Sequence, residues 1–337
     1  MPHRDIIAIG ASAGGVPALQ ALVSGLPAEL NAAVLIVLHI PGHTPTKLHE
    51  VLGRAGPLPA QLAADGETIR AGVIYVAPND RHLVIEDQRL RLTRGPRENR
   101  VRPCIDVLFR SAAVQFGPRV IGIVLTGMLD DGTAGLWAVK DRGGITIVQD
   151  PREAAYPSMP QSGLKHVTID HVLSISAMAP VLTRLTRDEL ISPLAARVGQ
   201  SLELEARIAI EGNALKHGVM DMGEISKNTC PECHGVLVRI REGSITRFRC
   251  HTGHAYSLQT LLVDTDKAVD DSLWGAIRAI EERALILREM EQIARTDGEL
   301  ELAANRANQA TDEEGRAQRI RELVVESDLP TSDLLPP

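Results

Sequence analysis

Residues of the types that carry out nucleophilic catalysis follow three separate apolar segments of the chain. Ser12 lies in the glycine-rich turn "GASAGG", His39 ends the apolar run "AAVLIVLH", and Asp130 and Asp131 follow the run "RVIGIVLTG". Acyl transfer uses a serine that attacks, a histidine that takes its proton, and a carboxylate that orients the imidazole. The pattern therefore predicts a hydrolytic site built from Ser12, His39 and one of the two aspartates.

The same residues allow other interpretations. The turn has Ser12 where a dinucleotide-binding fingerprint needs its second glycine, and it lacks the lysine of a phosphate-binding loop. Ser12 can instead cap the following helix. His39 can be a hydrogen-bonded histidine at a strand end, with His43 or His49 as the base, and the aspartates can form a turn that caps a helix.

The segments around these residues predict an α/β domain. From Asp5 to about Leu185, apolar runs such as "IIAIG" and "GGITIVQD" alternate with amphipathic stretches such as "VPALQALVSGL". This alternation is typical of a doubly wound, mostly parallel sheet with helices on both faces. The stretch "RHLVIEDQRLRLTR" predicts an antiparallel hairpin at the sheet edge. Because ligands bind at the carboxyl ends of parallel strands, we expect the candidate residues to meet there.

The composition changes after this domain, and the predicted organisation has five parts. They are an α/β catalytic domain (1–187), a polar helical connector (188–222), a small cysteine-containing module (223–256), a helical hairpin interrupted at "TDG" (257–326), and a disordered tail (327–337). The hairpin follows from leucine, isoleucine and valine residues that recur at three- and four-residue steps.

Three of the four cysteines have the spacing of metal ligands. Cys230 and Cys233 form a C-x2-C pair, and Cys250 follows after sixteen residues, next to His251 and close to His254. Two ligand pairs joined by a hairpin suit a closed, structural zinc site, and the metal would stabilise a segment too small for its own core. A redox role of "CPEC" is the alternative. We interpret Cys104, which stands apart, as a small buried apolar residue.

Composition narrows the class of protein. The net charge of -7 and the aromatic content of 2% argue against a nucleic-acid partner. The longest apolar run, "AAVLIVLHI", is much shorter than a membrane helix, and no secretory signal is evident at the start. These features predict a cytoplasmic protein without membrane insertion.

The first half of the chain resembles the catalytic domain of the chemotaxis-receptor protein-glutamate methylesterases. The matching stretches are "IGASAGG", "VLHIP", "GVIYVAPNDRHLVI", "RPCIDVLFRSAA", "VLTGMLDDGTAGL" and "VQDPREAAYPSMPQSGL". The resemblance implies that Ser12 is the nucleophile, His39 the base, and Asp131 rather than Asp130 the orienting acid. It also implies that the backbone N–H groups of Ala13 and Met128 bind the oxyanion.

The resemblance further implies a reaction and a partner. Glutamate γ-methyl esters on the cytoplasmic helices of a methyl-accepting chemotaxis receptor, or of a related methylated signalling protein, would be hydrolysed through an acyl-serine, with methanol released. Related enzymes also deamidate glutamine, and no cofactor is needed for catalysis. Two other functions remain open: a catalytically silent signalling adaptor with the same fold, and a hydrolase of small esters.

The chain also departs from the family's well-studied members. Ala13 replaces a threonine that follows the nucleophile, and the chain begins at the first catalytic strand, so we expect no phosphorylation-gated receiver domain in cis. Similar cysteine modules follow methylesterase domains in some bacterial proteins, where the histidine of "GHA" recurs, which favours His254 as the fourth zinc ligand. The arginines of "TRGPRENRVRP" either hold an acidic helical substrate or belong to a solvated loop.

Overall fold

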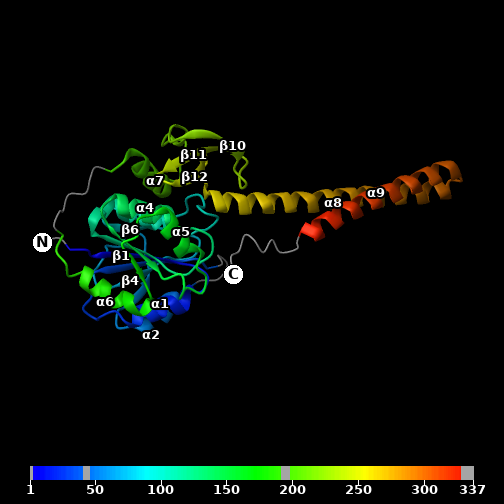
Figure 1. Ribbon diagram of the computed structural model, residues 1–337. Helices are drawn as coiled ribbons and strands as arrows, with labels where there is room; N and C mark the ends of the chain where they lie inside the picture. Colours follow the sequence, from blue (N-terminus) through cyan, green and yellow to red (C-terminus); the bar gives the residue numbers. More distant parts are fainter. Residues whose placement is uncertain (1–2, 41–45, 191–197, 328–337) are drawn as a thin grey trace. The chain divides into compact units, whose positions relative to one another are not determined.

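The computed structural model describes residues 3–40, 46–190 and 198–327 of the chain (Figure 1). The chain forms two compact units, Met1–Leu261 and Leu262–Pro337. The sequence predicts finer boundaries, after residues 187, 222, 256 and 326, and these stay predictions. The predicted tail falls almost entirely on residues 328–337, which lie outside the described residues. Among the helices of the described residues, none combines the length and the apolar character needed to span a membrane.

The first unit is built around a seven-stranded sheet in which all neighbouring strands run parallel. Its order is β3-β4-β2-β1-β7-β8-β9. The strands are β1 (Ile6–Ala11), β2 (Ala33–Leu38), β3 (Ala60–Leu62), β4 (Ile74–Val76), β7 (Val120–Val124), β8 (Ile145–Gln149) and β9 (His171–Leu173). The central strands β1, β2 and β7 are buried along their whole length, which explains their uninterrupted apolar sequences. The predicted α/β class is confirmed.

Helices cover both faces of this sheet (Figure 1). One face carries α1 (Gly15–Ser24), α2 (Leu48–Ala55) and α6 (Ile175–Leu185), and the other carries α3 (Ile105–Phe116), α4 (Thr133–Asp141) and α5 (Ser158–His166). Alternate residues of β1 point to opposite faces, so Ile7 and Ile9 enter one core and Ile6 and Ala8 the other. From β1 the chain runs to one side of the sheet through β2 and later to the other side through β7, so the strand order reverses between β1 and β7. In such sheets, ligands bind at the carboxyl ends of the strands where the order reverses.

The predicted hairpin forms, but its predicted place at the sheet edge is wrong. Strands β5 (His82–Glu86) and β6 (Arg89–Thr93) pair antiparallel as a separate two-stranded sheet. Asp87 and Gln88 turn the chain with φ of 48° and 59°, as a tight two-residue hairpin requires. The hairpin packs on α3 instead, where the Ile85 N–H donates to Ser111 Oγ at 3.1 Å. Burial of β5 against a helix thus replaces pairing with an edge strand.

Residues 198–261 complete the first unit. Helix α7 (Gln200–Glu211) precedes a four-stranded antiparallel sheet of β10 (Glu224–Thr229), β11 (Val236–Glu242), β12 (Ile245–Cys250) and β13 (Ala255–Ser257). We call residues 224–257 the Cys–His module. The sequence predicts a polar helical connector over residues 188–222. Within it, Leu202, Ile208 and Val219 are buried, and Thr93 Oγ1 donates to the Ala209 carbonyl of α7 at 2.7 Å. Helix α7 therefore packs against the α/β domain.

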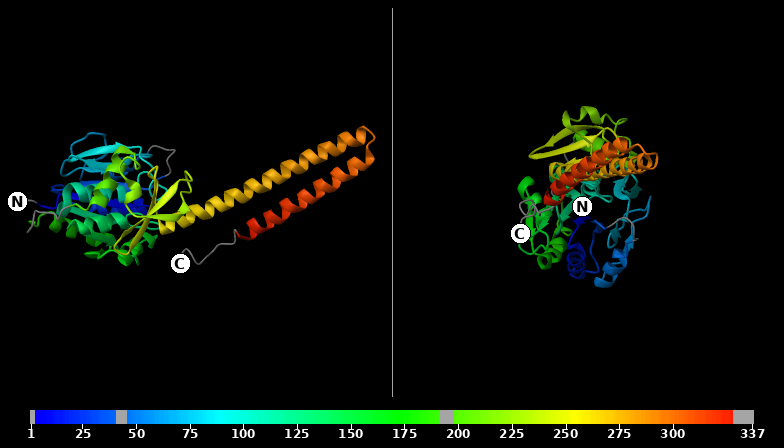
Figure 2. Two further views of the ribbon diagram at one scale, coloured as in Figure 1. Left: turned by 90° about the horizontal axis from the view of Figure 1, so that it is seen from above. Right: turned by 90° about the vertical axis from the view of Figure 1, so that its right-hand side faces the viewer.

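The second unit contains most of one long helix and the whole of another, joined by a short turn. Helix α8 (Leu258–Thr296) ends at the predicted "TDG" break, and α9 (Leu300–Ser327) returns beside it (Figure 2). Two ion pairs, Arg288–Glu314 and Glu281–Arg321, join the helices. From the first pair to the second, the residue number falls by seven along α8 and rises by seven along α9, so the helices are antiparallel. Buried apolar residues recur every seven positions along α9, and three of the four are alanine: Ala303, Ala310, Ala317 and Val324. Such spacing lets the two helices pack closely.

Candidate active site

Ser12 directly follows β1 and is held by the loop after β7. Its N–H donates to the Thr126 carbonyl at 3.0 Å. Gly127 packs against it so closely that a Cβ on this glycine would lie 2.8 Å from the Ser12 Cβ. Gly14, with φ of 73°, precedes α1 and no side chain caps that helix. The hydroxyl of Ser12 is therefore not used as a helix cap.

The structure brings Ser12, His39 and Asp131 together at the carboxyl end of the sheet. His39 Nδ1 lies 3.2 Å from Ser12 Oγ, and His39 Nε2 lies 2.8 Å from Asp131 Oδ2. A neutral imidazole has one N–H, and the carboxylate, which only accepts, places it on Nε2. The lone pair of Nδ1 then faces the serine hydroxyl. The arrangement can remove the hydroxyl proton as the oxygen attacks an electrophilic carbon.

The alternative residues are not part of this arrangement. Asp130 accepts a hydrogen bond from Ser257 Oγ at 2.8 Å. His49 lies on α2, and its Nδ1 has no partner among the described residues. His43 lies outside the described residues. Asp131, rather than its neighbour, thus faces the imidazole.

Asp131 is almost completely buried and surrounded by donors. Besides His39, the Ile105 N–H donates to Oδ2 at 2.8 Å and the Gly132 N–H to Oδ1 at 3.0 Å. Burial alone would raise the pKa of Asp131, but the hydrogen bond and charge of His39 and the hydrogen bond from the Ile105 N–H hold the pKa well below its usual range. The group therefore remains a carboxylate that can stabilise an imidazolium.

Comparisons with known proteins agree with this fold. Residues 7–182, about half of the chain, match the family described as CheB methylesterase. The chain belongs to the CheB methylesterase family. The predicted family resemblance is thereby confirmed for this part of the chain.

Individual relatives cover the same half. A Leptospira interrogans protein named putative protein-glutamate methylesterase/protein-glutamine glutaminase is 36% identical over 189 residues, which are 56% of this chain and 98% of the relative. A Methanosarcina mazei protein-glutamate methylesterase/protein-glutamine glutaminase is 37% identical over 192 residues, 55% of this chain and 52% of the relative. The chain thus spans about half the length of the second relative. The crystal structure of the Thermotoga maritima CheB methylesterase catalytic domain is 30% identical, with a TM-score of 0.52 over 55% of this chain and 100% of the domain.

Three further residues contact or lie beside Asp131 in this CheB-family chain: Asn99 and Asp106, for which the sequence predicts no role, and Cys104, which is buried as predicted. Asn99 Nδ2 donates to Asp131 Oδ1 at 2.9 Å, and Cys104 Sγ lies 3.1 Å from the same oxygen. Burial and the charge of Asp131 raise the pKa of Cys104 well above its usual value, so it stays a thiol that donates. Burial beside Asp131 also raises the pKa of Asp106 to about 8. The motif "RPCIDVLF" contains Cys104 and Asp106, but Asn99 had no signal beyond its place in an arginine-rich loop.

The candidate oxyanion groups belong to Ala13, which follows Ser12, and to Met128 in the loop after β7. In the described part of the chain, neither the Ala13 N–H nor the Met128 N–H has a hydrogen-bond partner. Large side chains on the surrounding segments are exposed: Val16 by 38%, Met128 by 41% and Tyr156 by 44%. Free N–H donors next to a nucleophile are what a developing oxyanion needs.

The arginine-rich loop of this CheB-family chain is partly neutralised by acids. Arg94 and Arg102 both pair with Asp80, at 2.8 and 2.6 Å. With Arg97 they line a cavity of about 690 Å³ that includes none of Ser12, His39 and Asp131 among its lining residues.

The three cysteines of the Cys–His module converge with one of the two candidate histidines. Cys233 Sγ lies 3.7 Å from Cys250 Sγ, and His254 Nδ1 lies 3.7 Å from Cys230 Sγ and 3.6 Å from Cys250 Sγ. All four cysteines of the chain are free thiols. A tetrahedral zinc site has edges of about 3.8 Å between sulfurs and about 3.6 Å between sulfur and nitrogen. The donor set therefore fits zinc in both chemistry and size.

The orientation of the histidine supports the same fit. His254 Nε2 lies 3.2 Å from Glu232 Oε2, which places its N–H on that side and leaves Nδ1 free to act as a ligand. His251 instead lies over Gly235, where a Cβ would come within 2.3 Å of its ring. His254, not His251, therefore shares the site with the cysteines.

Proposed function

We propose that this chain hydrolyses glutamate γ-methyl esters on methyl-accepting chemotaxis receptors or related methylated signalling proteins. The observation that carries the proposal is the position of the His39 ring between Ser12 Oγ and Asp131 Oδ2. The class of substrate comes from the names of the relatives, which act on glutamate methyl esters and glutamine side chains. The exposed apolar side chains beside Ser12 suit a substrate presented on a protein surface.

The residues divide the chemistry between two half-reactions. Ser12 Oγ attacks the ester carbonyl carbon as its proton passes to His39 Nδ1, and Asp131 stabilises the resulting imidazolium. The N–H groups of Ala13 and Met128 stabilise the oxyanion. Collapse of this intermediate breaks the bond to the methoxy oxygen, which takes the proton from the imidazolium and leaves as methanol.

The second half-reaction releases glutamate. A water molecule gives a proton to His39 Nδ1 and attacks the acyl-serine, and the proton returns to Ser12 Oγ as the ester bond breaks. With a glutamine side chain, ammonia would leave in place of methanol, which gives the glutaminase activity named for the relatives. None of these steps uses a cofactor.

We also propose that Cys230, Cys233, Cys250 and His254 hold a structural zinc ion. When bound, the ion links the ends of two hairpin turns and stabilises a module with only a small apolar core. We expect about one zinc per chain by elemental analysis, and loss of zinc with a lower melting temperature in Cys233→Ser. A module that retains its melting temperature without any metal would contradict the assignment.

The esterase proposal is tested by methanol release from methylated receptor, measured for the wild type and Ser12→Ala. Ser24→Ala, which removes an exposed hydroxyl from α1, is the matched control. We expect release to fall to background in Ser12→Ala alone. Equal rates in wild type and Ser12→Ala would favour the silent adaptor, and faster cleavage of a simple ester than of methylated receptor would favour a small-ester hydrolase.

A further inference from the structure

We propose that Asn99 is a positioning residue for Asp131, and that the Cys–His module holds Asn99 in place and so forms part of the support of the active site. This inference rests on the proposed hydrolase function. It assigns a role in catalysis to the part of the chain that lies beyond the family match at residue 182.

The Asn99 amide joins three parts of the first unit. Its Nδ2 donates to Asp131 Oδ1 and to Asp106 Oδ2, each at 2.9 Å, while its Oδ1 accepts from the Ser257 N–H at 3.1 Å. The Asp131 carboxylate only accepts and the Ser257 N–H only donates, so these two contacts allow just one orientation of the amide, with Nδ2 directed at both acidic side chains. Asn99 is 7% exposed, and water therefore competes little for these bonds.

The amide also meets a particular charge distribution. Asp106 and Asp131 lie on either side of Nδ2, and burial beside Asp131 raises the pKa of Asp106 to about 8. Near neutral pH, Asp131 then carries the negative charge that faces His39. A neutral donor at position 99 favours this state, whereas a third carboxyl would oppose it.

The backbone of Asn99 depends on the Cys–His module. Asn99 and Arg100 have φ of 49° and 71°, which residues other than glycine rarely adopt without support from their surroundings. The Asn99 N–H donates to the Ala255 carbonyl at 2.8 Å, and the Ala255 N–H donates to the Arg97 carbonyl at 3.3 Å. Strand β13 thus pairs with the loop that carries Asn99.

The candidate zinc ligands fix the start of β13. The Cys250 N–H donates to the His254 carbonyl at 2.9 Å, and Ala255 follows His254 directly. The turn that presents two of the ligands therefore also presents the carbonyl that binds Asn99.

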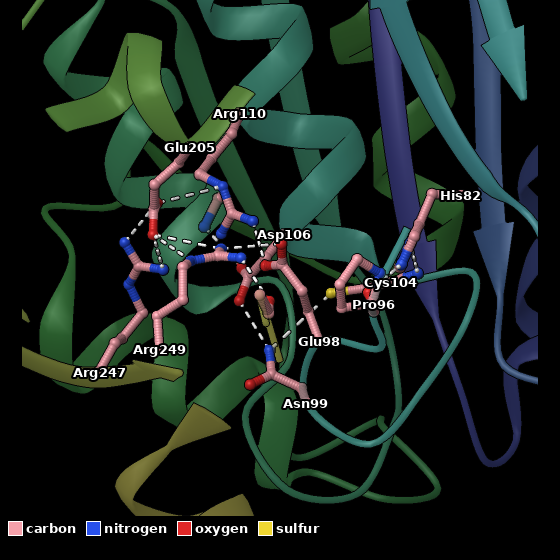
Figure 3. A network of polar contacts seen from close by, with 12 residues as sticks. His82, Pro96, Glu98, Asn99, Cys104, Asp106, Arg110, Glu205, Arg247 and Arg249 are labelled. Carbon is pink, nitrogen blue, oxygen red and sulfur yellow. Dashed lines mark hydrogen bonds and ion pairs between the residues drawn. The ribbon is translucent and has the colours of Figure 1, made fainter. Parts of the chain in front are cut away.

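Buried ion pairs clamp the neighbouring residue (Figure 3). Glu98 pairs with Arg110 of α3 and, at 2.8 Å, with Arg249 of β12. Arg249 also contacts Glu205 of α7, as does Arg247 at 2.6 Å. Because these charges are buried, the loop cannot move away from β12 without leaving a charge unpaired. A continuous chain of contacts therefore links the Cys–His module through Asn99 to Asp131.

Loss of the Asn99 amide would remove one donor from Asp131 Oδ1 and leave two backbone N–H groups and the Cys104 thiol close to that oxygen. The carboxylate would then be held less firmly, and the His39 ring would lose part of the fixed orientation that points Nδ1 at Ser12. Small errors of this kind in the placement of a catalytic group slow reactions by about 100-fold. We expect Asn99→Ala to react about 10- to 100-fold more slowly at Ser12 than the wild type does.

The test uses the full chain and a fluorophosphonate probe, which labels an activated serine without any receptor. The rate of Ser12 labelling is measured by mass spectrometry for the wild type, Asn99→Ala, and the surface control Asn305→Ala on α9. Each variant is also compared in an Asp131→Ala background. If Asn99 acts through Asp131, Asn99→Ala slows labelling in the wild-type background and changes it less than threefold when Asp131 is absent.

A second pair of variants tests the module. Ser257→Ala keeps the backbone N–H that binds Asn99, and Ser257→Pro removes it. We expect Ser257→Pro, but not Ser257→Ala, to slow labelling of Ser12 at least tenfold. Adding Asn99→Ala to Ser257→Pro should cause no further loss of rate. Melting temperatures identify any variant that has unfolded.

The outcomes separate the two proposals. Labelling of the wild type at Ser12 with an unchanged rate in Asn99→Ala would overturn the positioning role while the hydrolase proposal stands. A full multiplicative loss from Asn99→Ala in the Asp131→Ala background would also overturn it, because the effect would then bypass Asp131. Absence of Ser12 labelling in the wild type would overturn the proposed function and this inference together.

Discussion

The substitution Asp131→Asn keeps the shape of the side chain and replaces one acceptor oxygen by an NH2 donor. Every contact of Asp131 with its surroundings is one in which it accepts. The Gly132 N–H and Asn99 Nδ2 reach Oδ1, and the Ile105 N–H and His39 Nε2 reach Oδ2. Neither orientation of the new amide therefore satisfies the site.

The structure indicates which orientation wins. If the new NH2 group takes the Oδ1 position, it faces the N–H groups of Asn99 and Gly132. It also faces the Asp106 N–H, whose nitrogen lies 3.3 Å from Oδ1. With NH2 at the Oδ2 position, only the Ile105 N–H loses its acceptor, because the imidazole can move its proton to the other nitrogen. Each unsatisfied buried donor costs about 1–3 kcal/mol, so the second orientation is favoured.

That orientation inactivates the base. An imidazole with its proton on Nδ1 points an N–H, not a lone pair, at Ser12 Oγ. The same tautomer error in a serine protease lowers kcat about 10⁴-fold, or about 5.4 kcal/mol of barrier. We therefore expect Asp131→Asn to lower kcat/KM by about 10³- to 10⁴-fold.

The assay is methanol release, together with fluorophosphonate labelling of Ser12. Asp130→Asn is the matched control, because its carboxyl faces Ser257 and not the imidazole, and we expect its rate to change less than threefold. A fall of less than tenfold in Asp131→Asn, with the fold intact, would refute the tautomer argument.

The remaining predictions concern stability. Glu205→Ala leaves buried arginines unpaired and should lower the free energy of unfolding in urea by about 3–5 kcal/mol. Glu203→Ala, at an exposed position of the same helix, should change this free energy by less than about 1 kcal/mol. Similar losses in both variants would contradict the buried ion-pair network. Burial raises the pKa of Asp130 from 3.8 to about 6, so the folded state holds this proton more tightly and its contribution to stability falls as pH rises from about 4 to 6. Asp130→Asn should remove that decline. Its free energy of unfolding in urea should exceed that of the wild type by up to about 3 kcal/mol at pH 7 and should equal it at pH 4. The same difference in unfolding free energy at both pH values would contradict the raised pKa. Gly127→Ala forces a methyl group into the packed loop beside the nucleophile. It should lower the free energy of unfolding by about 1–3 kcal/mol and should also lower the rate of Ser12 labelling. Gly275→Ala, with open space around it, should lower neither quantity.

The fold of the first half could be predicted because strands buried on both faces have a local signature. β1 and β2 read as unbroken apolar runs, and the glycines between strands and helices marked the turns. The place of the β5–β6 hairpin could not be predicted in the same way. Alternation shows that two strands pair with each other, but whether they also join a sheet or pack on α3 depends on surfaces far away in sequence.

The polar segment before the Cys–His module illustrates a second limit. Glu205 and its neighbours read as a solvent-exposed helix, yet Glu205 is completely buried against arginines from α3 and β12. A charged residue is buried only when partners of opposite charge meet it, and those partners come from distant parts of the chain. No local pattern contains that information.

The sequence by itself determined the α/β architecture and the family. It also predicted that Ser12, His39 and one of two aspartates meet, because parallel strands present their carboxyl ends at one edge, while the choice of Asp131 came from the family resemblance. It also determined the spacing of the cysteines in the Cys–His module. The tertiary structure alone decided that Asn99 holds Asp131 and that Ser257 holds Asn99. These contacts join residues 32 and 158 positions apart, and such pairings arise only from the packing of the whole unit.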